Sequence, residues 1–212
     1  MIELYTIPGT AGLAPHMALE EAGAEYTMIR LKRDERGTVI DPPNYREINP
    51  HDRIPAMRVE GKLLTEQAAM VMWVSDAYPE AGLAPEVGSW ERATWYRWLV
   101  YLTNTIQIAH VRYFLPHRFT SDGTTDAVRD FAAAELVQLR DSLDAELGAG
   151  PYVLGDRFSS ADLALANMTR WGRRLEPKWW DAPNLGAHYE RIKSRPAIQR
   201  VYAQEELDDD VY

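Results

Sequence analysis

The first 23 residues limit what this chain can fold into more than any other stretch does. Residues 2–6, Ile-Glu-Leu-Tyr-Thr, have the composition of a short strand, and residues 8–12, Pro-Gly-Thr-Ala-Gly, that of a tight turn. Residues 13–22 place their apolar side chains on one face of a predicted helix. Pro15 agrees with this prediction, because proline is tolerated in the first turn of a helix, where its missing N–H would have no partner. The chain is therefore predicted to open as strand, turn and helix.

The turn between this strand and this helix is a candidate active site. A helix that begins after a glycine-rich turn directs free backbone N–H groups at one point, and that point attracts anions. The turn contains neither of the usual phosphate-binding loops, G-x-x-x-x-G-K-[ST] and G-x-G-x-x-G. The pattern therefore predicts an anion site of another kind.

Two further stretches have the character of strands. Residues 26–31 follow Gly23, which can end the first helix in a left-handed conformation, and we expect them to pair in parallel with the first strand. Residues 54–59 begin with Ile54-Pro55, and a strand is predicted to start immediately after the proline. A proline at the first residue of a strand costs no ladder hydrogen bond, and a cis bond before Pro55 would turn the Ile54 backbone outward.

The first half of the chain ends with a hairpin and a helix. Residues 60–62, Glu-Gly-Lys, predict a compact turn into a strand at residues 63–64. Residues 68–78 follow a helical pattern, for which Thr65 is the predicted cap. Before these elements, residues 32–43 are rich in charge and predict a surface loop. The predicted order of elements is β-α-β followed by β-β-α.

A domain boundary is predicted where prolines and a glycine interrupt the pattern. Two prolines and one glycine fall within residues 79–85. We assign residues 1–78 to a first domain, 79–86 to a linker and 87–212 to a second domain.

Beyond the linker, the hydrophobic pattern is that of a helical bundle. Apolar residues recur at three- and four-residue steps over residues 89–114 and again over 128–147, which predicts two long helices. Ser159 and Asp162 have the spacing of a capping box that opens a further helix. That helix is apolar on almost all sides, as expected for a helix in the middle of a bundle.

Composition and charge exclude several classes of function. The net charge of -9 and the isoelectric point near 5.1 argue against nucleic acid or an anionic membrane surface as the main partner. The sequence has no cysteine, so any sulfur chemistry must use the sulfur of a ligand. Its five histidines never fall in a metal-ligand spacing, and no metal site is expected. No apolar run approaches the ~20 residues of a spanning helix, so the expected location is cytoplasmic.

Several short motifs occur in a fixed order along nearly the whole chain. They are Pro8-Gly9-Thr10, Leu13-Ala14-Pro15-His16, Leu19-Glu20-Glu21-Ala22-Gly23, Asn49-Pro50, Ile54-Pro55-Ala56-Met57, Leu64-Thr65-Glu66-Gln67, Tyr78-Pro79-Glu80-Ala81 and the Ser159/Asp162 box. Each motif alone is weak, but in this order and spacing they resemble the cytosolic glutathione transferase superfamily, and within it the bacterial classes near the beta class.

The resemblance implies a fold and an activity. It implies a thioredoxin-like N-terminal domain (βαβ-ββα) that holds glutathione, an all-helical C-terminal bundle domain that supplies a pocket for a hydrophobic electrophile, and a homodimer. The implied enzyme is a glutathione transferase that conjugates the glutathione thiolate to a small hydrophobic electrophile in detoxification. Two alternatives stay open: a glutathione-binding protein with little or no turnover, and a glutathione-dependent reductase, lyase or isomerase.

The resemblance also implies where glutathione, the co-substrate, binds. The Ile54 backbone before cis-Pro55 should pair with the cysteinyl part, and Glu66 and Gln67 should hold the γ-glutamyl end. The physical chemistry agrees, because a carboxylate can take the ligand's ammonium group while helix N–H groups and an amide can take its carboxylate. Glu66 has the alternative role of an acid serving the helix dipole, and Arg53 that of a surface residue. The full set of expected binding positions is Gly12, Leu13, Arg53, Ile54, Pro55, Glu66 and Gln67.

The chain departs from the family pattern at the sulfur. The positions at which bacterial members carry a reactive serine or cysteine fall on Ala11 and Gly12. The candidate catalytic residues that remain are Thr10, the nearest hydroxyl in the turn, and Tyr5 at the end of the first strand. Thr10 is alternatively a turn or capping residue, and Tyr5 a core aromatic. Backbone amides after the turn can also stabilise a thiolate, because a hydrogen bond to a charged group contributes ~1.5–3 kcal/mol.

The predicted pocket for the second substrate lies on the first long helix of the second domain. Helical spacing suggests five lining residues, each of which could equally belong to the bundle core or to a dimer contact. They are Asn104, Gln107, His110, Val111 and Phe114. Many beta-class members carry a histidine in this helix, and the count from Trp98-Leu99 places Gln107 there.

Overall fold

The computed structural model describes residues 1–34, 38–148 and 150–209. The chain forms two compact units, which are described separately below. The first unit comprises residues 1–84 together with residues 195–212, and the second comprises residues 85–194. No helix formed by the described residues is long and apolar enough to cross a membrane.

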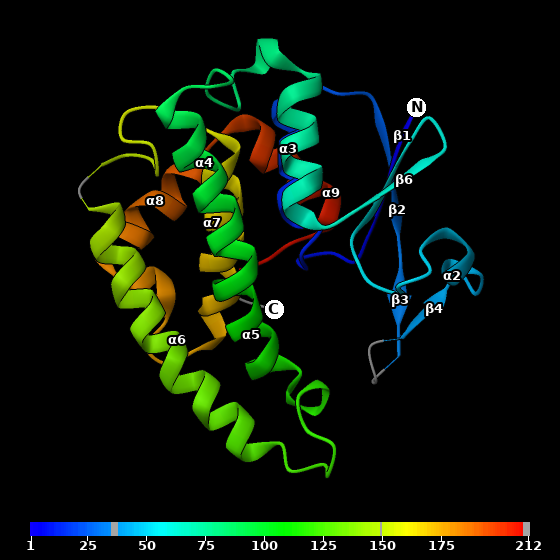
Figure 1. Cartoon of the computed structure of the whole chain (residues 1–212), viewed down its shortest axis with the longest axis vertical. Helices are drawn as coiled ribbons and strands as arrows, with labels where there is room; N and C mark the ends of the chain where they lie inside the picture. Colours follow the sequence, from blue (N-terminus) through cyan, green and yellow to red (C-terminus); the bar gives the residue numbers. More distant parts are fainter. Residues whose placement is uncertain (35–37, 149, 210–212) are drawn as a thin grey trace. The chain divides into compact units, whose positions relative to one another are not determined.

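The first unit is built on a four-stranded sheet with the strand order β2-β1-β5-β6 (Figure 1). The strands are β1 (Ile2–Thr6), β2 (Tyr26–Arg30), β5 (Ala56–Val59) and β6 (Lys62–Thr65). Strand β1 pairs in parallel with β2 and antiparallel with β5, and β5 pairs antiparallel with β6. This is the predicted thioredoxin-like mixed sheet, in which the β-α-β half and the β-β-α half meet between β1 and β5.

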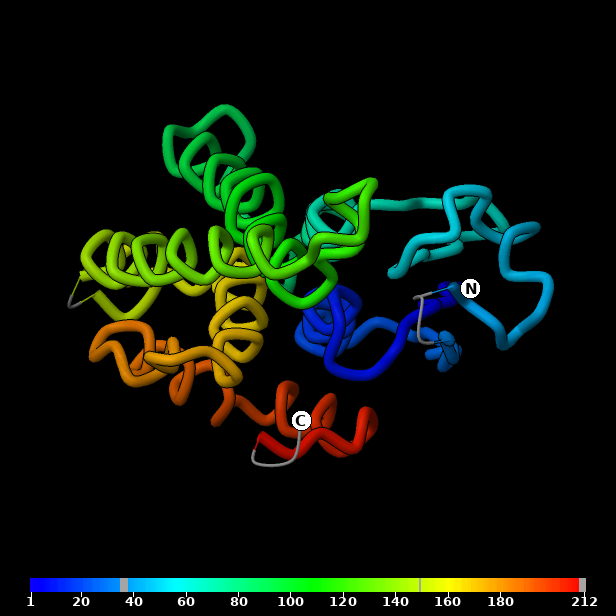
Figure 2. The backbone as a smooth tube through the Cα atoms, turned by 90° about the horizontal axis from the view of Figure 1, so that it is seen from below, coloured from blue at the N-terminus to red at the C-terminus, as the bar shows by residue number. Residues whose placement is uncertain are grey.

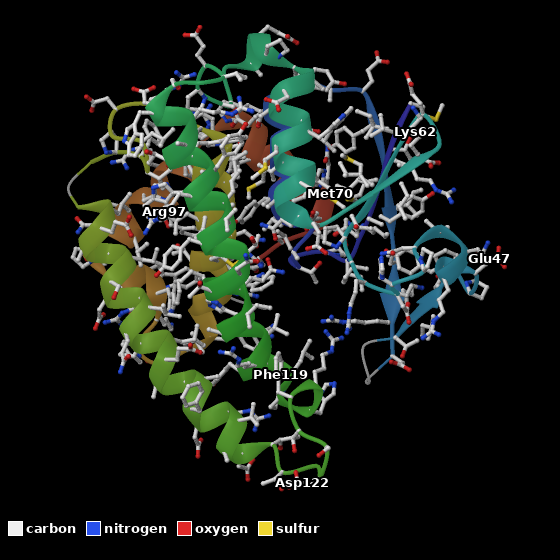
Figure 3. All side chains as sticks on the ribbon, in the orientation of Figure 1. Glu47, Lys62, Met70, Arg97, Phe119 and Asp122 are labelled. Atoms are coloured by element: carbon white, nitrogen blue, oxygen red, sulfur yellow. The ribbon has the colours of Figure 1, made fainter. Side chains whose placement is uncertain are left out.

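The first unit also contains helices, and α3 and α9 pack against α1. Its helices are α1 (Leu13–Glu21), α2 (Tyr45–Ile48), α3 (Gln67–Ala77), the short 3-10 helix η1 (Pro79–Ala81) and α9 (Pro196–Glu205). Helix α1 contacts both α3 and α9, and Met70, labelled in Figure 3, is one of the fully buried residues of α3. Helix α9 buries Ile198 and Val201. Packing therefore groups α9 with the first unit, although the sequence assignment put its residues in the second domain; the domain division 1–78, 79–86 and 87–212 stays a prediction.

Strand β5 begins at Ala56, directly after Pro55, as predicted. Two other local predictions for the first unit need correction. The stretch 32–43, predicted as a loop, contains a largely exposed two-stranded ribbon of β3 (Lys32–Arg33) and β4 (Val39–Asp41), and residues 35–37 lie outside the described part. Thr65 ends β6, so the residue that precedes α3 is Glu66 and not the predicted cap.

The second unit is a helical bundle (Figures 1 and 2). Its elements are α4 (Trp90–Tyr101), the π-helical turn η2 (Leu102–Ile106), α5 (Gln107–Phe114), η3 (Pro116–Arg118), α6 (Asp126–Leu147), α7 (Ser160–Trp171), η4 (Gly172–Arg174), η5 (Trp179–Asp181) and α8 (Pro183–Lys193). The predicted helix over residues 89–114 is helical almost throughout but is divided by the π-helical turn. A helical repeat in the sequence does not reveal such a turn, because it adds only one residue to the pattern.

Helix α7 occupies the middle of this bundle, as predicted. Its residues from Ser160 to Arg170 are all buried. The capping box is present, because the Asp162 carboxylate accepts a hydrogen bond from the backbone N–H of Ser159 at 2.8 Å and the Ser159 side chain accepts one from the backbone N–H of Asp162. The other carboxylate oxygen of Asp162 accepts a hydrogen bond from the backbone N–H of Val153 at 2.8 Å. Nearer the surface, Arg97 of α4, labelled in Figure 3, forms an ion pair with Glu146 of α6. The bundle thus combines an apolar central helix with charged pairs between its outer helices.

Candidate functional site

Three segments of the first unit that were predicted as binding segments lie close together. A Cβ atom placed on Gly12, just before α1, would lie 3.4 Å from Cβ of Pro55. Ala56 pairs with Thr65 across β5 and β6, so Pro55 and Glu66 each lie one residue beyond that pair. The beginning of α1, the segment before β5 and the beginning of α3 therefore meet at one end of the sheet.

The turn before α1 leaves backbone donors without partners. Within the turn, the N–H of Thr10 donates to the carbonyl of Ile7 at 3.2 Å, and the N–H of Leu13 donates to the carbonyl of Thr10 at 3.1 Å. The N–H groups of Ala11 and Gly12 have no hydrogen-bond partner within the described residues. Since buried backbone donors are nearly always paired in folded proteins, two free ones at a helix N-terminus indicate a place for an anionic ligand.

Gly12 has no room for a side chain. A Cβ atom there would lie 1.8 Å from Oγ1 of Thr6 and 2.6 Å from its Cβ atom. Thr6 is fully buried at the end of β1 and cannot move aside without disturbing the strand. A serine or cysteine at position 12 is therefore incompatible with this packing, and the backbone of the turn lies directly against β1.

The two hydroxyl groups proposed as catalytic are both engaged elsewhere. Oγ1 of Thr10 donates to the carbonyl of Ile7 at 2.6 Å, and the hydroxyl of Tyr5 donates to Oε2 of Glu3 at 3.1 Å. The Tyr5 ring is buried and belongs to an apolar cluster with Tyr45. Burial also raises the pKa of Tyr5, which disfavours its phenolate. These contacts fit the alternative roles, a turn residue for Thr10 and a core aromatic for Tyr5.

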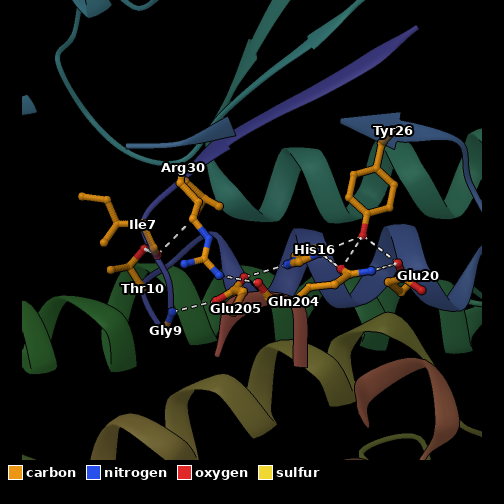
Figure 4. Close-up of polar contacts among 10 residues, drawn as sticks. Ile7, Gly9, Thr10, His16, Glu20, Tyr26, Arg30, Gln204 and Glu205 are labelled. Atoms are coloured by element: carbon orange, nitrogen blue, oxygen red, sulfur yellow. Dashed lines mark hydrogen bonds and ion pairs between the residues drawn. The ribbon is translucent and has the colours of Figure 1, made fainter. Parts of the chain in front are cut away.

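Glu205, a buried glutamate of α9, forms a hydrogen bond with the turn before α1 (Figure 4). Oε2 of Glu205 accepts a hydrogen bond from the backbone N–H of Gly9 at 2.7 Å, and its Oε1 lies 2.7 Å from Nδ1 of His16. Both side chains are fully buried. One carboxylate therefore connects the turn, helix α1 and helix α9.

The hydrogen bonds around Glu205 and His16 continue to β2, the edge strand of the sheet. Nε2 of His16 lies 2.7 Å from the hydroxyl of Tyr26 and 2.7 Å from Oε1 of Gln204, and the side chain of Arg30 donates to the backbone carbonyl of Gln204 (Figure 4). No local sequence pattern indicates this role of Glu205, because it lies 196 residues from Gly9.

The segment before β5 presents one more free donor. The Ile54–Pro55 peptide bond is cis, as predicted. The side chain of Ile54 packs against the apolar cluster around Tyr45, while its backbone N–H has no partner among the residues that the structure describes. The side chain of Arg53 is exposed. This agrees with the predicted strand-like pairing between the Ile54 backbone and a ligand.

At α3, two polar side chains lie at the helix N-terminus. Glu66 is exposed and has φ 68° and ψ 118°, a conformation that a residue with a side chain adopts only at a cost of ~1–3 kcal/mol. Gln67 is 4% exposed, and its Oε1 accepts no hydrogen bond from the described residues. A strained backbone and an unsatisfied buried amide at one helix N-terminus are typical of a binding site.

The predicted pocket residues of the second unit differ in their surroundings. His110 is fully buried, its ring centroid lies 4.7 Å from that of Trp179, and Nδ1 lies 2.9 Å from the carbonyl oxygen of Ile106. Burial lowers its pKa to about 4, so the ring is neutral at pH 7. His110 thus has the surroundings of a core residue rather than of a pocket wall. The other four candidates, Asn104, Gln107, Val111 and Phe114, keep some exposure.

Comparison with known proteins identifies the family of this chain. The sequence matches the glutathione S-transferase N-terminal domain over residues 1–75 and the C-terminal domain over residues 102–196. A sphingomonad glutathione S-transferase, solved in complex with glutathione, is 30% identical with a TM-score of 0.86, and the match covers 97% of this chain and all of that one. The chain belongs to the glutathione transferase superfamily.

Two other relatives support this family. The bacterial beta-class glutathione S-transferase of Sphingomonas chungbukensis is 30% identical with a TM-score of 0.86, over 97% of this chain and 100% of that chain. The glutathione S-transferase GstA of Escherichia coli O157:H7 is 26% identical over 97% of this chain and its own full length. At the level of the family, the predicted enzyme class, its co-substrate and the two-part fold are confirmed.

Proposed function

We propose that this transferase binds glutathione at the end of the sheet where α1, β5 and α3 meet, and joins its thiolate to a small hydrophobic electrophile. The observation that carries the proposal is that the N–H groups of Ala11 and Gly12, next to cis-Pro55, and the N–H group of Ile54 have no partner among the residues that the structure describes. Donors for a thiolate and for a peptide carbonyl then lie at neighbouring positions, as a small thiol peptide requires.

Each part of glutathione has a matching group. The Ile54 backbone pairs with the cysteinyl moiety, Glu66 takes the γ-glutamyl ammonium group, and Gln67 with the N–H groups of α3 takes the γ-glutamyl carboxylate. The sulfur is held by the N–H groups of Ala11 and Gly12, where the positive end of the helix dipole favours negative charge. The exposed guanidinium of Arg53 is available to the glycyl carboxylate.

Backbone donors are sufficient for useful catalysis. A hydrogen bond to a charged group contributes ~1.5–3 kcal/mol, and a shift of one pKa unit corresponds to ~1.4 kcal/mol, so two N–H groups can lower the pKa of the bound thiol by about one unit or more. The thiol proton leaves to solvent, the thiolate attacks an electrophilic carbon, a carbon–sulfur bond forms, and the leaving group departs with its electron pair. The four partly exposed residues Asn104, Gln107, Val111 and Phe114 are proposed to contact the electrophile.

Two further features of the proposed enzyme follow from its superfamily. We propose that it acts as a homodimer and that it works in the cytoplasm. Neither feature is needed for the chemistry described above.

A conjugation assay tests the proposal. The purified protein is incubated with glutathione and a chlorinated dinitrobenzene, and the thioether product is followed by its absorbance. We expect a glutathione-dependent rate that falls when Glu66 is replaced by glutamine. Absence of any such rate with a broad panel of electrophiles, together with glutathione binding in calorimetry, would instead support the alternative described next.

The alternative is a glutathione-binding protein with little turnover. It is favoured by one observation, the absence of a side-chain hydroxyl or thiol at Ala11 and Gly12. The Ala11→Ser variant separates the two functions. If backbone donors already support turnover, added serine should change the rate little, whereas a protein limited by the missing hydroxyl should gain activity at least tenfold.

A further inference from the structure

The carbonyl group of Arg53 is held by two buried side chains of the first unit. It accepts a hydrogen bond from the hydroxyl of Tyr45 at 2.7 Å and another from Nδ2 of Asn49 at 2.7 Å. Tyr45 is 1% exposed and Asn49 is fully buried. A single peptide oxygen thus receives both of the hydrogen bonds that its two lone pairs can accept.

Both polar atoms of the Asn49 amide group have hydrogen-bond partners. While Nδ2 donates to Arg53, Oδ1 accepts a hydrogen bond from the backbone N–H of His51 at 3.1 Å. Only this orientation of the amide satisfies both contacts. The backbone N–H of Asp52 donates in turn to the carbonyl of Asn49 at 2.9 Å, and Asp52 itself has φ 51°. The segment from residue 49 to residue 53 is therefore a closed turn built around one buried amide.

The held carbonyl belongs to the same peptide group as the N–H of Ile54. Because a peptide group is planar and trans, fixing the direction of the Arg53 carbonyl fixes the N–H of Ile54 in the opposite direction. That N–H has no partner among the described residues. Hydrogen bonds in a chain also polarise one another, so a carbonyl that accepts two of them makes its own N–H a stronger donor.

From this arrangement we propose that Tyr45 and Asn49 are positioning residues that aim and polarise the Ile54 N–H toward the cysteinyl carbonyl of glutathione. The inference rests on the proposed function. Burial raises the pKa of Tyr45 above its ordinary value of 10.0, so its hydroxyl keeps its proton and remains a donor over the working pH range. The Tyr45 ring also belongs to the apolar cluster that Ile54 packs against, which fixes the distance between the hydroxyl and the turn.

The test compares three variants and one control variant with the wild-type enzyme. Tyr45→Phe removes one hydrogen bond and keeps the ring, while Asn49→Asp keeps the acceptor for His51 but replaces the donor to Arg53 by an oxygen. We expect the KM for glutathione and its calorimetric Kd to rise about five- to tenfold in each, with kcat changed less than twofold, because the sulfur is held elsewhere. In the double variant the two effects should not multiply, since both bonds end on one oxygen. Tyr189→Phe, which alters a tyrosine of the second unit that is 2% exposed, is the matched control and should leave both constants unchanged.

A second measurement does not depend on glutathione. In the ligand-free protein, the Ile54 amide proton should move upfield in the nuclear magnetic resonance spectrum of Tyr45→Phe, because its amide group is less polarised. An unchanged Kd in folded Tyr45→Phe and Asn49→Asp overturns the inference but leaves the proposed function standing. If either variant does not fold, the other decides. If the wild-type protein does not bind glutathione at all, the proposed function fails and this inference fails with it, whatever the amide signal does.

Discussion

The two helices that begin at the candidate site, α1 and α3, differ in what their N-termini present. At α1, the hydroxyl of Thr10 is turned back to the carbonyl of Ile7, and Gly12 has no room for a side chain, so only backbone N–H groups remain free. At α3, Glu66 is exposed and Gln67 has an amide oxygen without a partner among the described residues. One helix thus presents its backbone and the other its side chains.

The difference teaches how the two ends of one ligand can be recognised. A sulfur anion needs donors and a positive dipole, which a bare helix N-terminus supplies. An amino acid end carries both charges, and needs a carboxylate as well as donors. Binding by the backbone N–H groups at the N-terminus of α1 depends on the geometry of the turn, so other parts of the fold must hold that turn in place. The predictions that follow test this, from the largest expected effect to the smallest.

Gly12→Ala should have the largest effect. The added Cβ atom would lie 1.8 Å from Oγ1 of the buried Thr6, so the turn or the strand must shift, at a cost of ~3 kcal/mol or more. We expect a lower midpoint in urea unfolding and loss of glutathione binding. Gly23→Ala is the control, because Gly23 has φ +63° but no atom within 4 Å of the added carbon, and it should cost only ~1 kcal/mol. Equal losses in the two variants would show that packing against β1 does not set the turn.

Glu205→Gln should have the second largest effect. The carboxylate contacts both the N–H of Gly9 and the ring of His16, whereas a glutamine side chain is uncharged, has one acceptor oxygen and can satisfy both contacts only if Nδ1 of His16 carries no proton. We expect unfolding to become easier by ~1–3 kcal/mol and the KM for glutathione to rise.

The control for this variant is the ion pair at the other end of α9. Arg195 donates to Glu21 from Nε at 2.6 Å and from Nη2 at 2.8 Å, and these two bonds join the beginning of α9 to the end of α1. Arg195→Gln should cost ~1 kcal/mol or less of stability and leave the KM unchanged. A rise in KM in both variants would mean that any loosening of α9, rather than loss of the Gly9 contact, disturbs the turn.

Glu66→Gln tests the role of side chains at the N-terminus of α3. Removing the charge that is proposed to face the ligand's ammonium group should weaken glutathione binding about tenfold, which corresponds to ~1.4 kcal/mol, with little change in stability because Glu66 is exposed. Isothermal titration calorimetry measures both the affinity and its enthalpy. Glu60→Gln is a close control, since Glu60 is also exposed and also has a positive φ, of 50°. A weaker affinity in Glu60→Gln would indicate a general effect of net charge.

The same comparison shows what the sequence could and could not predict. The position of Glu66 and Gln67 between strand β6 and helix α3 was predictable, because these residues are neighbours in a local strand-to-helix pattern. The capping box at Ser159 was predictable for the same reason, and the cis bond before Pro55 was implied by the resemblance to the family. The lack of space at Gly12 depends on Thr6 from another element, and the Glu205 contact joins the two ends of the chain, so neither leaves a periodic signal.

Thr10→Ala should have the smallest effect, and it tests the idea that the α1 end works through its backbone. Its hydroxyl donates its only proton to the carbonyl of Ile7 at 2.6 Å, so it has none left for a thiolate. We expect the conjugation rate and the apparent pKa of the bound thiol, read from the pH dependence of kcat/KM, to change by less than twofold and less than ~0.3 unit. If Thr10 instead supplied the sulfur's donor, its loss would raise that pKa by about one unit or more, because a hydrogen bond to a charged group contributes ~1.5–3 kcal/mol. Activity at low pH would then fall more than activity at high pH. The proposal that α1 holds the sulfur through backbone N–H groups alone would then be wrong.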